Sequence, residues 1–279
     1  MSIFDIHIHA CGALTKTTFE PQSLLKKMEV AGVSGGCVFS GAPKYWGGDR
    51  VYSPKERLDE VLRCCEGYRD RLYPILWVHP EEDGTLDAVE EAAERGIMGF
   101  KIICNNFYVY EDKSMELLEK IGKTNRPVLF HSGILWDDTV SCEYNRPLHW
   151  EAVCRIPGLR FSLAHCSWPW YDEAIALYGK LCFLHRKDAS RYSEMYLDLT
   201  PGTPVPYRRD LYRKLLGSGY DIENNLLWGT DCFADAYDTQ WAQQWHQRDE
   251  SIFDELGISG ETREKIYNEN RKRFFRVTE

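Results

Sequence analysis

The chain has 279 residues and a net charge of −9, from 34 basic and 43 acidic side chains. This acidic balance, without blocks of like charge, argues against a nucleic-acid-binding protein. No apolar run is long enough to span a membrane, no signal peptide is evident, and the ten cysteines include no CxxC pair. We therefore expect a cytoplasmic protein with reduced thiols that contacts neither nucleic acid nor membrane.

Apolar segments alternate with amphipathic ones along the chain. Short apolar runs bounded by glycine, proline or polar residues are typical of buried strands, and longer amphipathic stretches are typical of helices. The predicted strands comprise residues 1–10, 36–40, 72–78, 96–104, 127–132, 159–165, 195–200 and 226–231. The predicted helices comprise residues 19–32, 54–68, 85–95, 114–124, 147–156, 169–178, 207–218 and 260–273.

This alternation is typical of parallel strands joined by crossover helices. Eight such units over this length favour a (β/α)8 TIM barrel over an open doubly wound sheet. A dinucleotide-binding sheet would carry a G-x-G-x-x-G turn after its first strand, and none is present. No low-complexity linker divides the chain. We therefore predict an α/β protein with a single TIM-barrel domain comprising residues 1–279.

The first strand carries three ionisable side chains on one face. Residues i, i+2 and i+4 of a strand point the same way, so Asp5, His7 and His9 project together. Burying them costs free energy unless they bind something, and neutral imidazole is a preferred ligand of zinc and related ions. The pattern favours a metal site over two solvated histidines at a polar strand end.

Other predicted strands also end in metal-ligand or proton-carrying residues. TIM-barrel enzymes gather their chemistry at the C-terminal ends of the strands. The groups found there are Lys101, His131, His165 and Asp231. A single histidine would be explained best as a satisfied core side chain, but the same coincidence on several strands favours one shared site.

Motifs at these strand ends resemble those of a known family. DIHIH, GFKI, FHSG, LAHC and WGTDC resemble the amidohydrolase-2 branch of the amidohydrolase superfamily, and NRKRFF is similar to the N-x-x-R-x-F that usually closes it. The resemblance extends over essentially the whole chain. It implies a metal-dependent TIM barrel, in a family of hydrolases, lactonases, hydratases and nonoxidative decarboxylases. The metal ligands that it implies are His7, His9, His131 and Asp231, with His165 beside the metal as an acid, base or substrate-polarising group.

The chemistry of these residue types agrees with that implication. Histidines and a carboxylate can hold a zinc-like ion, leave a position for water and lower the pKa of that water. Asp231 can then accept the proton of the water, and His165 can hydrogen-bond an oxygen on which charge develops. We expect one divalent ion, zinc by default, with manganese an alternative for the same ligands. Asp5 is expected to orient a ligand or Lys101 rather than bind the metal.

Lys101 admits two roles. In some branches of the superfamily a carboxylated lysine on the fourth strand bridges two metals, so the site would then hold two ions. A plain lysine would instead bind a substrate carboxylate or pair with Asp5. The resemblance to the amidohydrolase-2 branch implies one metal and favours the substrate or structural role.

The loops that follow the strands should determine specificity. They carry aromatic and arginine side chains that suit a flat or carboxylated organic substrate. The candidate substrate contacts are Lys101, Arg50 and Trp136. Exposed loop aromatics are equally suited to the contacts of a homodimer.

We therefore expect a metal-dependent hydrolase that cleaves an ester, lactone or amide bond of a small organic substrate through a metal-activated water. A nonoxidative decarboxylase of an aromatic or enoic acid on the same site is the first alternative. Phosphodiester cleavage would need a basic surface, which the net charge disfavours. A non-catalytic barrel with a structural metal would not need His165 in addition to a complete set of ligands.

Overall fold

The computed structural model describes residues 2–10, 19–43 and 52–277. Within these ranges nine strands form one parallel sheet in the order β8-β7-β6-β5-β4-β3-β2-β1-β9. The strands are β1 Ile3–His9, β2 Val33–Phe39, β3 Leu72–Trp77, β4 Gly99–Ile102, β5 Val128–Phe130, β6 Arg160–Leu163, β7 Glu194–Asp198, β8 Leu226–Leu227 and β9 Cys232–Phe233. Consecutive strands from β1 to β8 are neighbours, as expected when helices connect parallel strands.

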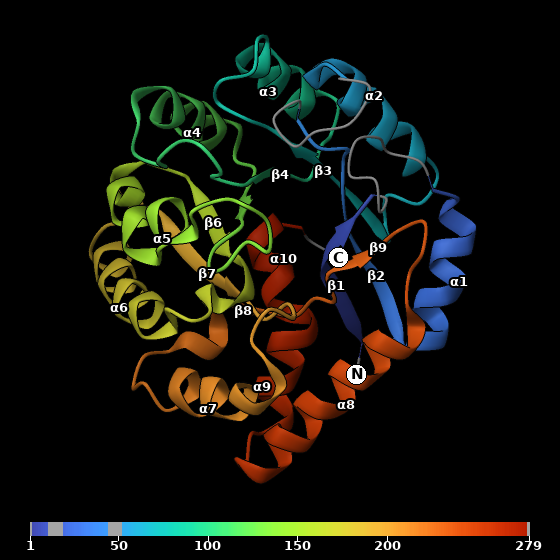
Figure 1. Ribbon diagram of the computed structural model, residues 1–279, viewed down its shortest axis with the longest axis vertical. Coiled ribbons are helices and arrows are strands. Elements are labelled where there is room, and N and C mark those ends of the chain that lie inside the picture. The colour runs from blue at the N-terminus through green and yellow to red at the C-terminus, as the bar shows by residue number, and fades with distance from the viewer. Residues whose placement is uncertain (1, 11–18, 44–51, 278–279) are drawn as a thin grey trace.

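Helices surround the curled sheet (Figure 1). They are α1 Pro21–Ala31, α2 Pro54–Cys64, α3 Thr85–Glu94, α4 Asp112–Thr124, α5 Ser141–Tyr144, α6 Tyr171–Lys187, α7 Val205–Leu216, α8 Thr239–Glu255, α9 Gly260–Glu264 and α10 Asn270–Phe275. Shorter 3-10 segments comprise Pro147–Arg155, Ala164–Ser167 and Ile222–Asn224, and Lys265–Glu269 is π-helical. None of the helices in the described ranges is long and apolar enough to cross a membrane.

The two shortest strands, β8 and β9, belong to one segment, and this segment pairs with β7 on one side and with β1 on the other. β8 pairs with β7, and β9 pairs with β1. Between them, the Ile6 N–H donates to the Trp228 carbonyl at 2.9 Å, and the Asp231 N–H donates to the His7 carbonyl at 3.0 Å. The sheet is therefore strongly curled and TIM-barrel-like, and the end of β1 lies beside Asp231.

One end of the sheet is covered by the C-terminal helix. A cluster of buried side chains inside the curled sheet combines Phe4 and Ile75 of the strands with Phe274 and Phe275 of α10. The Arg160 side chain at the start of β6 donates from Nε to the Phe274 carbonyl at 2.8 Å. Because α10 covers the N-terminal ends of the strands, the C-terminal ends face the opposite side.

The predicted strands and helices recur with shifted ends, with three informative differences. The strand predicted over residues 159–165 ends at Leu163, because His165 and the two residues after it have left-handed φ values of 58°, 45° and 59°. The helix predicted over residues 169–178 continues to Lys187. The 17-residue helix α8 is not predicted, although Asp238 caps it by accepting from the Trp241 N–H.

Candidate metal centre

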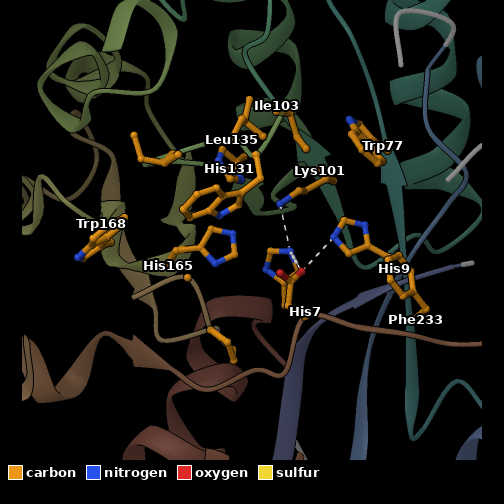
Figure 2. Close-up of a pocket in the computed structure, with 15 residues that line it drawn as sticks. His7, His9, Trp77, Lys101, Ile103, His131, Leu135, His165, Trp168 and Phe233 are labelled. Atoms are coloured by element: carbon orange, nitrogen blue, oxygen red, sulfur yellow. Dashed lines mark hydrogen bonds and ion pairs between the residues drawn. The ribbon is translucent and has the colours of Figure 1, made fainter. Parts of the chain in front are cut away.

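A pocket of about 310 Å³ lies at the C-terminal ends of the strands (Figure 2). It is lined by every polar group that the sequence analysis selected at a strand end: His7, His9, Lys101, His131, His165 and Asp231. The structure therefore brings together six side chains from β1 and from four other strands or the residues that follow them. The remaining walls are largely apolar and include Trp77, Trp168 and Phe233.

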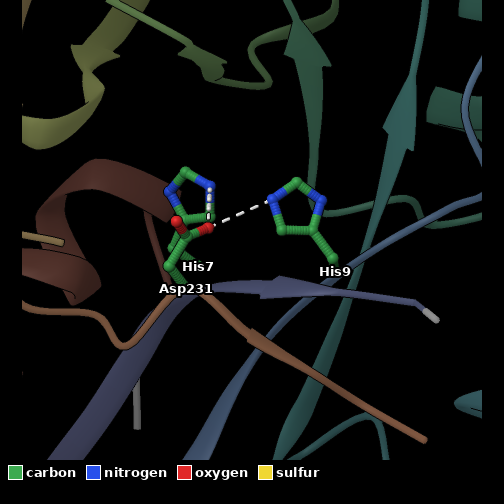
Figure 3. A group of neighbouring side chains, drawn as sticks. All are labelled: His7, His9 and Asp231. Carbon is green, nitrogen blue, oxygen red and sulfur yellow. Dashed lines mark ion pairs between the residues drawn. The ribbon is translucent and has the colours of Figure 1, made fainter. Parts of the chain in front are cut away.

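His7, His9 and Asp231 form the closest group of potential ligands (Figure 3). Asp231 Oδ1 lies 3.5 Å from His7 Nε2 and 3.2 Å from His9 Nε2. One ligand atom from each of the three side chains lies within 4.8 Å of the other two. Asp231 adopts a left-handed φ of 62°, which aspartate tolerates better than most residues. Two imidazoles and a carboxylate are a donor set that binds zinc and related divalent ions.

The ionisation of this group suits a metal ion, which needs neutral imidazole and ionised carboxylate. Burial, followed by the charge of Lys101, lowers the pKa of His7 well below its ordinary value. Burial opposes ionisation of Asp231, but the hydrogen bond from His9 and the charges of His7 and His165 hold its pKa well below the usual range. A divalent cation would therefore meet His7 and Asp231 in the state in which they bind it.

His131 and His165 lie farther along the pocket. Their ring centroids are 5.0 Å apart, and the His165 ring is 5.5 Å from that of His7. His131 is outside the close group of three, so its assignment as a metal ligand stays a prediction. His131 Nε2 and His165 Nδ1 are buried and have no hydrogen-bond partner among the described residues. Neither nitrogen is therefore committed to a polar partner in the described part of the chain.

Gly202 allows the loop that follows β7 to approach the His165 side chain closely. A Cβ atom added to Gly202 would lie 2.6 Å from the His165 Cβ and 2.8 Å from its Nδ1. Real Cβ atoms do not approach that closely, so any larger residue here would displace the His165 ring.

Lys101 is fully buried at the base of the pocket. Its Nζ lies 3.5 Å from His7 Nε2 and 4.9 Å from the centroid of the Phe39 ring. Burial lowers its pKa to about 8, against the attraction of Asp198 and Asp231. This position is compatible with contact to a substrate carboxylate.

Asp5 contacts the segment that carries Asp231. Its carboxylate accepts hydrogen bonds from the His7 N–H, the Thr230 N–H and hydroxyl, and the Tyr237 hydroxyl, at distances between 2.6 and 3.1 Å. Burial raises its pKa to about 7, opposed by these hydrogen bonds. Within the described part of the chain no hydrogen bond joins Asp5 to Lys101. Asp5 therefore orients the backbone next to two of the candidate ligands rather than Lys101.

Of the two predicted loop contacts, Trp136 lies within the described residues. Trp136 lines the pocket and is 81% exposed, so most of its side chain is accessible to a ligand. Arg50 lies outside the described residues.

Sequence reasoning missed one side chain of the site. Asp198 ends β7 and is fully buried, and its Oδ2 lies 2.8 Å from His7 Nδ1. Burial raises its pKa, against the nearby positive groups and the hydrogen bonds from Thr200. The available signal was its place at the end of the apolar run MYLDL, the same position that identified the other groups.

Comparison with known proteins identifies the family. Residues 52–277 match the model of a family described as amidohydrolase. The chain belongs to the amidohydrolase family. This confirms the resemblance found in the strand-end motifs, which the matched residues include from β4 onward. In addition, 130 residues, 46% of this amidohydrolase chain, are 28% identical to protein fluG of Emericella nidulans. The aligned part is 14% of fluG, so the chain corresponds to a small part of that protein.

Solved structures with this fold include both hydrolases and decarboxylases by name. One is a probable 2-pyrone-4,6-dicarboxylic acid hydrolase from Acinetobacter baumannii, 14% identical, with a TM-score of 0.65 and coverage of 99% of this chain and 100% of that one. A 2,6-dihydroxybenzoate decarboxylase from Rhizobium is 13% identical, with a TM-score of 0.64 and coverage of 99% and 98%. A dihydroxybenzoic acid decarboxylase from Polaromonas, with bound manganese, is 14% identical, with a TM-score of 0.64 and coverage of 99% and 97%. At these identities the likeness shows the amidohydrolase fold alone.

Proposed function

We propose that this protein is a metal-dependent hydrolase that cleaves an ester, lactone or amide bond of a small aromatic or carboxylated substrate. The observation that carries the proposal is the convergence of His7, His9 and Asp231 in one pocket. Membership of the amidohydrolase family supports an enzyme, and the structural neighbours include one with bound manganese.

In this proposal His7, His9 and Asp231 would hold one divalent ion, with His131 as the proposed fourth donor. We propose zinc by default, with manganese the alternative for the same donors. When bound, the ion supplies a water of lowered pKa and a Lewis-acid contact for a carbonyl oxygen. A second ion would be required only if Lys101 were carboxylated.

Three side chains of the pocket then provide proton transfer, stabilisation of negative charge and substrate binding. Asp231 accepts the proton of the attacking water through its carboxylate and returns that proton to the leaving group. His165, which lines the pocket, donates a hydrogen bond to the oxygen on which negative charge develops. Lys101 binds a carboxylate of the substrate at the base of the pocket.

The shape of the pocket supports a small, flat substrate. A volume of about 310 Å³ is at the lower end of the range for small-molecule sites. Trp77, Trp168 and Phe233 provide apolar walls, and Trp136 adds an exposed ring at the mouth. Aromatic rings of the substrate would stack against such walls.

We also propose that the fold is a complete (β/α)8 barrel and that residues 1–279 form one domain. In this view Leu226–Phe233 acts as the eighth strand, because it hydrogen-bonds to both β7 and β1.

A substrate panel tests the proposed reaction. Protein loaded with zinc or manganese is offered aryl esters, lactones, anilides and hydroxybenzoic acids, and both acid release and CO₂ release are measured. We expect hydrolysis, and we expect Asp231→Asn to reduce its rate at least 100-fold because proton transfer is worth about 10²–10⁴-fold. Asp210→Asn, a change of a partly exposed carboxylate on α7 outside the pocket, is the control and should act like wild type.

The apolar aromatic walls and the two decarboxylase neighbours favour nonoxidative decarboxylation as the second candidate. CO₂ release from an aromatic acid without any hydrolysis would contradict the hydrolase proposal in favour of that candidate. Full hydrolytic activity in Asp231→Asn would contradict the proton transfer assigned to Asp231.

A further inference from the structure

The buried contact between Asp198 and His7 joins the first strand to the seventh. Asp198 Oδ2 lies 2.8 Å from His7 Nδ1, and neither side chain is more than 1% exposed. The two residues are 191 positions apart in the chain, and the strands β2 to β6 lie between β1 and β7 in the sheet. The contact therefore crosses the interior of the curled sheet rather than following from strand pairing.

The Asp198 carboxylate is fixed on its other side. Its Oδ1 accepts hydrogen bonds from the Thr200 N–H at 2.6 Å and from the Thr200 hydroxyl. The Asp198 carbonyl accepts a hydrogen bond from Cys166 Sγ at 3.4 Å, next to His165. These contacts hold the carboxylate in one orientation, so that Oδ2 faces His7.

A close approach of three chain segments encloses this pair. A Cβ atom added to Gly229 would lie 2.8 Å from Thr200 Oγ1 and 3.1 Å from the His7 Cβ. The segment between β8 and β9 therefore passes between Thr200 and His7 only because residue 229 has no side chain.

We infer that Asp198 is a positioning residue that selects the tautomer of His7 in which Nδ1 carries the proton. A neutral imidazole has one N–H and one lone pair, and the partner of one ring nitrogen decides which nitrogen is which. With Nδ1–H donated to Asp198, the lone pair of Nε2 points at the space beside Asp231 Oδ1, 3.5 Å away. The opposite tautomer would place a proton there and exclude a metal ion.

This inference rests on the proposed metal site. It assigns to Asp198, at the end of β7, the orientation of His7, which is the most buried of the proposed ligands. Asp198→Asn keeps the size of the side chain but turns Oδ2 into a group that donates. If its amide nitrogen faces His7 Nδ1, the imidazole proton must move to Nε2. Loss of such an outer hydrogen bond lowers metal affinity about 10–100-fold.

The first measurement uses metal-free wild-type protein and needs no variant. Two-dimensional ¹H–¹⁵N NMR of histidine-labelled protein, with His7 assigned from its loss in His7→Gln, reports which ring nitrogen is protonated. We expect a protonated Nδ1 and an unprotonated Nε2 in wild type, and the reverse in Asp198→Asn. A protonated Nε2 in wild-type protein would overturn the inference.

The second measurement is zinc affinity, by competition with a chromophoric chelator, on metal-free protein whose folding is checked by its melting temperature. We expect a Kd at least 10-fold higher in Asp198→Asn. The matched control is Glu194→Gln, the same chemical change at the other end of β7, where the Tyr196 hydroxyl and the Asn225 amide still have an oxygen to donate to. Equal affinity in wild type and Asp198→Asn, or equal loss in both variants, would overturn the inference. Wild type that binds neither zinc nor manganese would overturn the proposed function instead, and the NMR signals would still report on Asp198.

Discussion

The buried ion pair between α7 and α8 supports the end of β7, and breaking it should destabilise the protein strongly. Asp249 accepts hydrogen bonds from Arg208 Nε at 2.9 Å, from Arg208 Nη2 at 3.0 Å and from Trp228 Nε1 at 3.1 Å. The Arg208 Nη2 also donates to the Leu199 carbonyl at 2.6 Å, directly after Asp198. Arg208 and Asp249 are essentially fully buried, so neither charge can be solvated if the other is removed.

Asp249→Ala leaves the Arg208 guanidinium buried without its counter-charge, and such a loss is worth about 3–5 kcal/mol. That is a large part of the roughly 5–15 kcal/mol by which folded domains are stable. At about 2–4 °C per kcal/mol for a chain of this size, the melting temperature should fall by roughly 6–20 °C. Urea unfolding followed by tryptophan fluorescence and by circular dichroism measures the change.

The same two helices provide a control. Arg209 and Glu255 form an ion pair with both side chains about half exposed, with Arg209 Nε 2.7 Å from Glu255 Oε1. Glu255→Ala should reduce the free energy of unfolding by no more than about 1 kcal/mol, because water solvates the remaining charge. Replacing both buried partners, as in Arg208→Met with Asp249→Leu, should recover most of the stability lost in Asp249→Ala. A loss in Asp249→Ala as small as that in Glu255→Ala would refute the argument from desolvation.

Two further predictions concern the site. Wild-type protein purified without added metal should contain about one ion per chain by elemental analysis. The double variant His7→Ala with His9→Ala should contain none, because it loses two of three converging donors. Two ions in wild type would instead indicate a carboxylated Lys101. Trp136→Ala should raise KM roughly 2–10-fold with little change in kcat, because an aromatic contact is worth about 0.5–1.5 kcal/mol. The control is Phe183→Ala, which removes an exposed aromatic side chain on α6. An unchanged KM in Trp136→Ala would exclude contact between Trp136 and the substrate.

The strand-end residues could be predicted because the signals are local. His7 and His9 alternate with isoleucines in one strand, and His131 and His165 follow short apolar runs, so the chemistry is visible within a few residues. Their grouping then follows from the parallel fold, in which all such ends lie on one side.

The partners of these residues could not be predicted in the same way. Asp198 pairs with His7 across the sheet interior, and Asp5 contacts Thr230, so neither pairing is visible in the local sequence. The buried face of α8 includes Asp249 together with Trp245, and the acid is tolerated only because Arg208 lies opposite. The apolar periodicity of α8 is therefore too weak to predict this helix from the sequence.

The left-handed backbone conformations at the site could not be predicted from the sequence either. His165 and Asp231 have positive φ, which aspartate and histidine adopt more often than most residues but not often enough for a sequence pattern to predict it. Both line the pocket, where backbone strain is common. The strand prediction 159–165 failed at this point for that reason.

The hydrogen bonds from Thr230 to Asp5 join residues 225 positions apart. The entropy of closing so long a loop must be offset before these contacts form, and contacts of high sequence separation are associated with slow folding. A partly folded chain therefore has separated halves of the candidate centre, with its histidines on one part and its carboxylate on another. A cation bound by both would act as a reversible cross-link over most of the chain, stabilising the native state by an amount that rises with the concentration of free metal. Resistance to unfolding and to proteolysis should thus report the metal supply of the surrounding solution.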